Sequence, residues 1–126
     1  MLRLAVPAPD PWPPRTPAQL QVEVMNLGVR PWPAFGFLPR HLVHLRACIR
    51  RPDEVSCASL PIPLPADVPA GGRVPVAVPL EAPLWEGPYA LDVRLVQGED
   101  GPLARCGVAM LRVPIRVGRR NPNPPP

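Results

Sequence analysis

The sequence contains no lysine, and only two of its 126 residues are histidine. All fourteen basic residues are arginine, a bias that we attribute to a GC-rich genome rather than to function. The arginines form only two doublets, at 50–51 and 119–120, and the others are dispersed among ten acidic residues. A nucleic-acid-binding surface normally concentrates its positive charge on one face. We therefore expect no nucleic-acid partner.

Long hydrophobic runs are also missing. A proline-rich stretch follows the first six residues, so no apolar segment is long enough for a signal peptide or a membrane-spanning helix. We expect a cytoplasmic protein with no membrane partner. The three cysteines, Cys48, Cys57 and Cys106, are an odd number, which favours reduced, half-buried side chains over a disulfide framework. A Cys48–Cys57 bridge between neighbouring strands remains open if the chain is exported.

Proline is abundant, since 24 prolines and 9 glycines make up about a quarter of the chain. Such a composition is often disordered. However, 46% of the residues are hydrophobic, the net charge is only +4, and the apolar residues recur periodically. We therefore predict one folded domain punctuated by prolines, with a Pro-rich N-terminal segment over 1–18, a β-sandwich over 19–117 and a disordered Pro-rich tail over 118–126.

Apolar and polar residues alternate with the period of a β-strand in several segments. The predicted strands are 2–6, 20–25, 42–50, 55–60, 73–78, 89–97 and 108–117. Residues 61–69 contain four prolines, so we expect a loop that crosses between sheets. Pro75 and Pro114 lie inside predicted strands, which requires a sheet edge or a bulge at each. The fold class is all-β, an immunoglobulin-like antiparallel β-sandwich of six to eight strands.

Several short motifs carry a family resemblance. They are Asn26-x-Gly28 followed by Trp32, the segment from Ala70-Gly71 through Ala82-Pro83-x-x-Glu86-Gly87-x-Tyr89, and Gly107 before the closing strand. With these motifs the chain resembles the immunoglobulin-like four-tryptophan domain of selective-autophagy receptors and its bacterial relatives, over about three-quarters of its length. The resemblance implies a sandwich that recognises client proteins and has no enzymatic activity.

The chain departs from that family at three of the four tryptophan positions. Trp32 alone is kept, and the other three positions fall on Val22, Val93 and Leu111. All three residues face inward in the predicted strand phasing, so an aliphatic core replaces an aromatic one. A fold of this kind hosts many unrelated functions, which makes the inherited function an analogy.

Trp12, Trp32 and Trp85 are the candidate partner-binding residues, because each is predicted to lie in a loop beside proline or glycine. The connections that carry Trp12 and Trp85 emerge at the same pole of a sandwich, which would make the two rings neighbours. An aromatic pair there binds a partner or plugs the open end of the core. Trp32 is a core residue on the family pattern. The Tyr89 hydroxyl is expected to bond backbone, as in a tyrosine corner.

Catalytic and metal-binding patterns are weak. His41, His44, Cys48 and Cys57 resemble a zinc set, but strand residues 44 and 48 are about 13 Å apart, and zinc needs ligands within about 2.3 Å. The same separation prevents His44 from activating Cys48. Nothing else in the sequence defines a catalytic triad around the available hydroxyls, Thr16, Ser56 and Ser59. Asp92 is expected to pair with Arg94 at the surface. We predict no metal, no cofactor and no enzyme.

The function predicted from the sequence is that of a non-catalytic interaction module whose partner is a protein or peptide. One alternative is a carbohydrate-binding module, because aromatic loops suit sugar rings equally well. The other is a structural or assembly subunit, in which an outer apolar face packs against further copies of the chain as a homo-oligomer.

Overall fold

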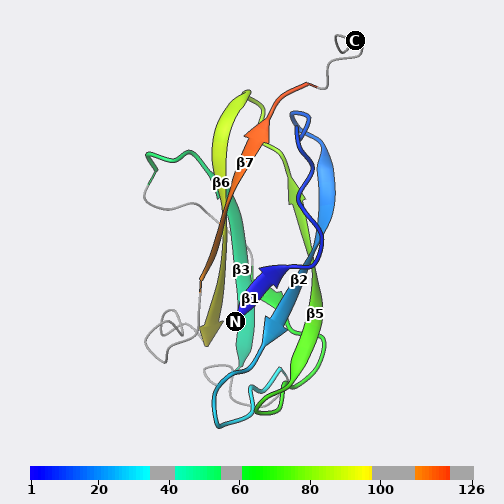
Figure 1. Ribbon diagram of the computed structural model, residues 1–126, viewed down its shortest axis with the longest axis vertical. Coiled ribbons are helices and arrows are strands. Elements are labelled where there is room, and N and C mark those ends of the chain that lie inside the picture. The colour runs from blue at the N-terminus through cyan, green and yellow to red at the C-terminus, as the bar shows by residue number, and fades with distance from the viewer. Residues whose placement is uncertain (35–41, 55–60, 98–109, 120–126) are drawn as a thin grey trace.

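The computed structural model describes residues 1–34, 42–54, 61–97 and 110–119, and Figure 1 shows them as two β-sheets packed against each other. The strands in this part of the chain are β1 (Leu2–Leu4), β2 (Pro17–Met25), β3 (Val43–Arg50), β4 (Pro61–Pro63), β5 (Arg73–Glu81), β6 (Gly87–Gln97) and β7 (Leu111–Val117). One sheet has the order β1-β2-β5 and the other β4-β3-β6-β7, with antiparallel pairing throughout. The predicted immunoglobulin-like β-sandwich is confirmed.

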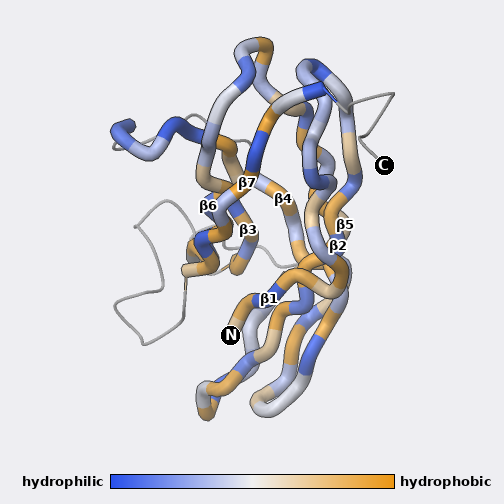
Figure 2. Tube along the Cα trace, turned by 45° about the horizontal axis from the view of Figure 1, so that its top comes forward, coloured by the Kyte–Doolittle hydropathy of each residue, from blue (hydrophilic) through white to orange (hydrophobic). Residues whose placement is uncertain are grey.

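The core lies between the sheets and is built mainly by alternate residues of the strands. Figure 2 colours the backbone by hydropathy and shows hydrophobic and hydrophilic residues following one another along the strands. In β2, Leu20, Val22 and Val24 are buried, while the residues between them are more exposed. Val93 on β6 is fully buried as well. Period-two alternation in the sequence therefore identified the inward face correctly. None of the described residues belongs to a helix that could span a membrane.

The prolines of β4, β5 and β7 lie on outer strands, where a missing N–H group does not break the sheet, and Pro17 and Pro88 lie at the beginnings of the central strands β2 and β6. Pro75 on β5 and Pro114 on β7 are both at sheet edges, as predicted. The Asn26 N–H bonds the Gly72 carbonyl, and the Ala82 N–H bonds the Thr16 carbonyl. These two bonds lie at the two ends of the β2–β5 ladder, and hydrogen-bonded pairs recur at every second residue between them. The backbone N–H and C=O groups of even-numbered β5 residues therefore bond β2, and those of odd-numbered residues face the free edge of the sheet.

The prediction of a loop over 61–69 is wrong for its first three residues, which form β4. Leu45 of β3 is paired with Ile62, and the flanking prolines tolerate this pairing because β4 is an outer strand. The predicted strand over 55–60, the first two residues of the strand over 108–117 and most of the tail over 118–126 lie outside the described residues.

The N-terminal segment joins both sheets. Strand β1 pairs with β2, and the chain then crosses to the other sheet, where Trp12 forms a parallel bridge with Val117. The Asp10–Pro11 peptide bond within this crossing is cis. Leu2 and Trp12 are buried in the same core as the central strands, so the Pro-rich segment contributes to the sandwich itself.

Candidate functional site

Two loops adjoin at the end of the sandwich where β5 and β7 finish and where β2 and β6 begin, at the top of Figure 1. We call this end the upper pole. The Arg15 N–H donates to the carbonyls of Ala82 and Pro83 at 3.1 and 3.3 Å, and the Ala82 N–H donates to the Thr16 carbonyl at 3.1 Å. The two loops that carry Trp12 and Trp85 are therefore held side by side.

Trp12 lies inside the upper pole with 0% of its surface exposed. Its indole Nε1 donates to the Thr16 carbonyl at 2.9 Å. Its backbone N–H bonds the Arg116 carbonyl, and its carbonyl accepts from the Gly118 N–H, both at 2.9 Å. The ring closes the end of the core, which is the plug alternative of the sequence analysis, and it presents no surface to a partner.

Trp85 has the opposite environment, since 67% of its surface is exposed and the adjacent Leu84 is 54% exposed. The Tyr89 hydroxyl donates to the Trp85 carbonyl at 2.8 Å, which confirms the predicted bond from this tyrosine to backbone. Gly87 follows with a φ of 144°, a conformation that residues with a side chain rarely adopt. The loop is thus fixed by hydrogen bonds to its backbone carbonyls, while its two largest apolar side chains face solvent.

A groove of about 720 Å³ lies beside this loop, between β3 and β4 of one sheet and the end of β5 in the other. Its described lining is mostly aliphatic and contains one charged residue, Glu81. The lining residues are Ala47, Cys48, Ile49, Pro61, Ile62, Pro63, Pro79, Leu80, Glu81 and Pro83. Pro83 connects the groove to the loop, because Leu84 and Trp85 follow it directly in the chain.

Trp32 belongs to the opposite end of the molecule, which we call the lower pole. It is 9% exposed and forms an antiparallel bridge with Val68 through two backbone hydrogen bonds. The structure therefore separates Trp32 from the other two tryptophans and buries it, in agreement with its predicted core position. Partner binding by any tryptophan stays a prediction, and Trp85 alone of the three has an accessible side chain.

Asn26 organises the lower pole, a role that the sequence analysis did not identify. Its side chain is fully buried. The amide Nδ2 donates to the carbonyls of Arg30 and Val68 at 2.8 and 3.1 Å, and Oδ1 accepts from the Gly28 N–H at 2.9 Å. Val29, which lies in the turn after Asn26, is 92% exposed. An Asn-x-Gly sequence after a strand signals such a turn, but it does not show that the amide will be buried.

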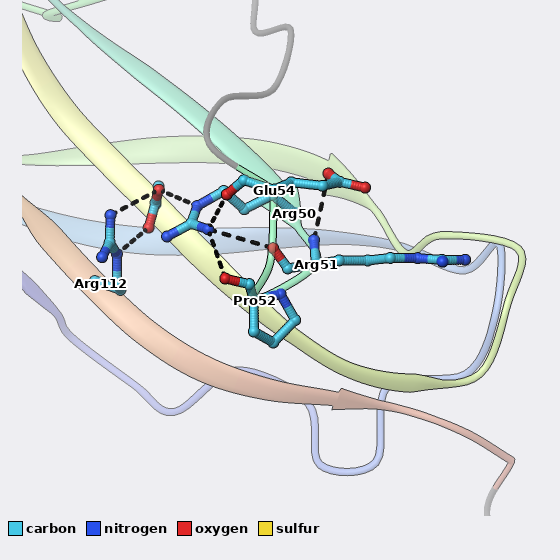
Figure 3. A network of polar contacts seen from close by, with 6 residues as sticks. Arg50, Arg51, Pro52, Glu54 and Arg112 are labelled. Atoms are coloured by element: carbon cyan, nitrogen blue, oxygen red, sulfur yellow. Dashed lines mark hydrogen bonds and ion pairs between the residues drawn. The ribbon is translucent and has the colours of Figure 1, made fainter.

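A charged network joins β3, β6 and β7, and Figure 3 shows the side chains of Arg50 and Arg112 within it. Arg50 Nε donates to Asp92 Oδ2 at 2.7 Å, and Arg112 Nε donates to Asp92 Oδ1 at 2.9 Å. The predicted surface pair of Asp92 with Arg94 is wrong. Asp92 is 8% exposed, because the neighbouring strands bring an arginine to it from each side.

The network has electrostatic and structural consequences. Burial alone would raise the pKa of Asp92, but the hydrogen bonds from Arg112 and Arg50 outweigh it and hold this pKa below its usual value. Arg50 also donates through one terminal nitrogen to the carbonyls of Arg51, Pro52 and Glu54, which closes the turn after β3. We interpret the network as a structural clasp.

The expected reduced state of the cysteines is wrong for Cys48, which is disulfide-bonded. Cys57 and Cys106 lie outside the described residues. His44 is half-buried, and burial together with the nearby Arg46 lowers its pKa. His41 also falls outside the described residues. Across the ranges that the structure describes, no group of three or more His, Cys, Asp or Glu side chains is placed to hold a metal ion.

Comparisons with known proteins identify the fold alone. No protein-family model and no curated protein matches the sequence. One similar solved structure is a CARDB domain from Pyrococcus furiosus, with a TM-score of 0.55 and 15% identity over 92% of this chain and 93% of that domain. Another is SSP-19, an MSP-domain-like protein from Caenorhabditis elegans, with a TM-score of 0.38 and 13% identity over 87% of this chain and 94% of that one.

The CARDB neighbour overturns the resemblance to the four-tryptophan domain. The matching residues have general structural roles, because Asn26 holds a turn, Gly87 supplies a positive φ and Tyr89 ties a loop to the strand after it. An unrelated sandwich needs the same residues at similar places. The four-tryptophan assignment is therefore wrong, and the chain is similar to a CARDB domain in the arrangement of its two sheets.

Proposed function

We propose that this chain is a non-catalytic interaction module that binds a protein or peptide partner at the upper pole, with Trp85 and Leu84 as anchors. The observation that carries the proposal is the exposed tryptophan on a loop whose backbone carbonyls accept hydrogen bonds from Tyr89 and Arg15. Tryptophan is enriched among the residues that dominate binding energy. A loop already fixed in one conformation loses little entropy when it binds, so more of the contact energy appears as affinity.

The composition of the neighbouring groove favours a peptide over a sugar. Sugar hydroxyl groups require several converging polar side chains, whereas the described lining of this groove offers one, Glu81. Aliphatic side chains and proline rings instead suit the apolar side chains of a protein or peptide. The carbohydrate-binding alternative depends on Trp85 alone as a stacking platform.

Affinity capture from a lysate of the source organism tests the proposal, with the full chain as bait and two single variants beside it. Trp85→Ala removes the proposed anchor. Val29→Ala is the matched control, because it truncates a 92% exposed apolar residue at the lower pole. We expect a protein that the parent and Val29→Ala enrich and that Trp85→Ala loses. If Val29→Ala failed to enrich the captured protein while Trp85→Ala still enriched it, binding would lie at the lower pole and the proposal would be refuted.

A further inference from the structure

The groove that Pro83 joins to the Trp85 loop is poor in backbone donors. Four of its lining residues are prolines, which have no N–H group: Pro61, Pro63, Pro79 and Pro83. Pro79 also faces the free edge of β5, by the parity of the β2–β5 ladder. A peptide that adds a strand to a sheet needs a regular series of backbone donors and acceptors. Strand addition at this groove is therefore disfavoured, and recognition through the side chains of the ligand is favoured.

Polyproline II peptides meet this requirement, because they have no internal hydrogen bonds and dock by packing proline rings on aromatic and apolar surfaces. The groove supplies the apolar surface through Ile49, Ile62 and Leu80. Trp85 supplies an exposed ring, and its indole N–H is available to donate to a carbonyl of the peptide.

Charge adds a second requirement. Glu81 lines the groove and Glu86 follows Trp85, and both residues are exposed. Neither carboxylate takes part in an ion pair within the described part of the chain. Arg15 on the adjoining loop is exposed too and offsets part of this charge. The carboxylates beside the anchor favour a peptide that carries positive charge next to its prolines.

We propose that the groove and Trp85 together bind a basic, proline-rich peptide in the polyproline II conformation. This inference rests on the proposed function, whose site it shares, and it adds the chemistry of the partner. The specificity follows from three features of the site: proline-lined walls that disfavour strand addition, an exposed indole for proline rings, and two carboxylates for a cation.

The test titrates the full-length chain with an oligoproline peptide that ends in two arginines, and it follows the indole N–H signal of Trp85 by nuclear magnetic resonance. Two matched peptides replace the prolines by serine or the arginines by glutamate. Trp85→Ala and Val29→Ala serve as the site variant and the control variant, after circular dichroism shows that each is folded.

We expect a saturable shift of the Trp85 signal with the arginine peptide and at least fivefold weaker binding of each matched peptide. Because Trp85→Ala has no indole signal, binding to both variants is followed at the backbone amides of residues next to Glu81 and Pro83. We expect affinity to be weakened more than tenfold in Trp85→Ala and to be unchanged in Val29→Ala. No saturable shift up to about 1 mM peptide, or equal binding of the serine peptide, would overturn the inference. Capture that still depends on Trp85 would then leave the proposed function standing.

Discussion

The two poles of the sandwich are closed by different physical means. At the upper pole an apolar ring, Trp12, fills the end of the core with 0% exposure. At the lower pole a polar side chain, Asn26, is equally buried and bonds three backbone groups. The apolar closure depends on buried area and tolerates imprecise geometry, whereas the polar closure depends on every partner being present. Mutations at the two poles should therefore destabilise the protein for different physical reasons.

Trp12→Ala tests the apolar closure and should have the largest effect. Removing a fully buried indole leaves a cavity, so the free energy of unfolding should fall by about 3–5 kcal/mol. Urea denaturation measures the change. Trp12→Phe is the control, because it keeps an aromatic ring in the core. It loses part of the side-chain volume and the whole hydrogen bond to the Thr16 carbonyl. A loss below about 1 kcal/mol for Trp12→Ala would show that the pole can collapse around the gap.

Asp92→Asn tests a third closure, the charged clasp, and should cost about 3 kcal/mol because two arginines lose their carboxylate. The pKa of Asp92 is lowered on folding from an ordinary value of 3.8, so its stabilisation is present above that value and is lost as the pH falls through the lower, folded-state pKa.

Urea denaturation at several pH values measures this dependence. Below about pH 4 the parent should lose stability more steeply than Asp92→Asn. Asp53→Asn is the control, because Asp53 is an exposed carboxylate in the turn that Arg50 closes. If the free energy of unfolding fell equally steeply with decreasing pH in the parent and in Asp92→Asn, the assignment of the clasp would be contradicted.

Asn26→Ala tests the polar closure. It leaves the Val68 and Arg30 carbonyls and the Gly28 N–H without their side-chain partner, and we expect a loss of about 2 kcal/mol. Asn26→Asp sharpens the comparison, because the second carboxylate oxygen would face two carbonyl oxygens and should destabilise the pole as well. Hydrogen exchange at the amides of Gly28 and Trp32 reports the local effect. Unchanged protection from exchange in both variants would contradict the conclusion that the Asn26 side chain organises the lower pole.

Trp85→Ala should have the smallest effect on stability, within about 0.5 kcal/mol, because the side chain is 67% exposed. The same urea experiment, run beside Trp12→Ala, compares two tryptophans on adjoining loops. A loss above about 1 kcal/mol would mean that Trp85 supports the fold, and it would weaken its proposed role as a free anchor.

Much of the architecture could be predicted from the residues because the relevant interactions are local or periodic. The alternation around Val22 identified a strand and its buried face. The absence of an N–H group placed Pro75 and Pro114 at sheet edges. The fixed turn before Tyr89 directed its hydroxyl to a nearby carbonyl. Each of these inferences needs only the few residues on either side.

The misassigned features depend on strands that are distant in the sequence. Asp92 pairs with Arg50 and Arg112, which lie 42 and 20 residues away, rather than with the nearby Arg94. The edge strand at Pro61–Pro63 exists because β3 provides a partner for it. Similar turn motifs also led to the wrong family, since turns repeat among unrelated sandwiches.

The sequence by itself determined that this protein is an all-β sandwich, because hydrophobic periodicity and proline stereochemistry act within a few residues. Only the tertiary structure decided which tryptophan plugs the core and which faces solvent. Trp12 and Trp85 have similar proline-containing surroundings in the sequence, but backbone bonds to Arg116 and Gly118 draw the first into the core. Exposure is a property of the assembled sheets, and it arises only when distant strands meet.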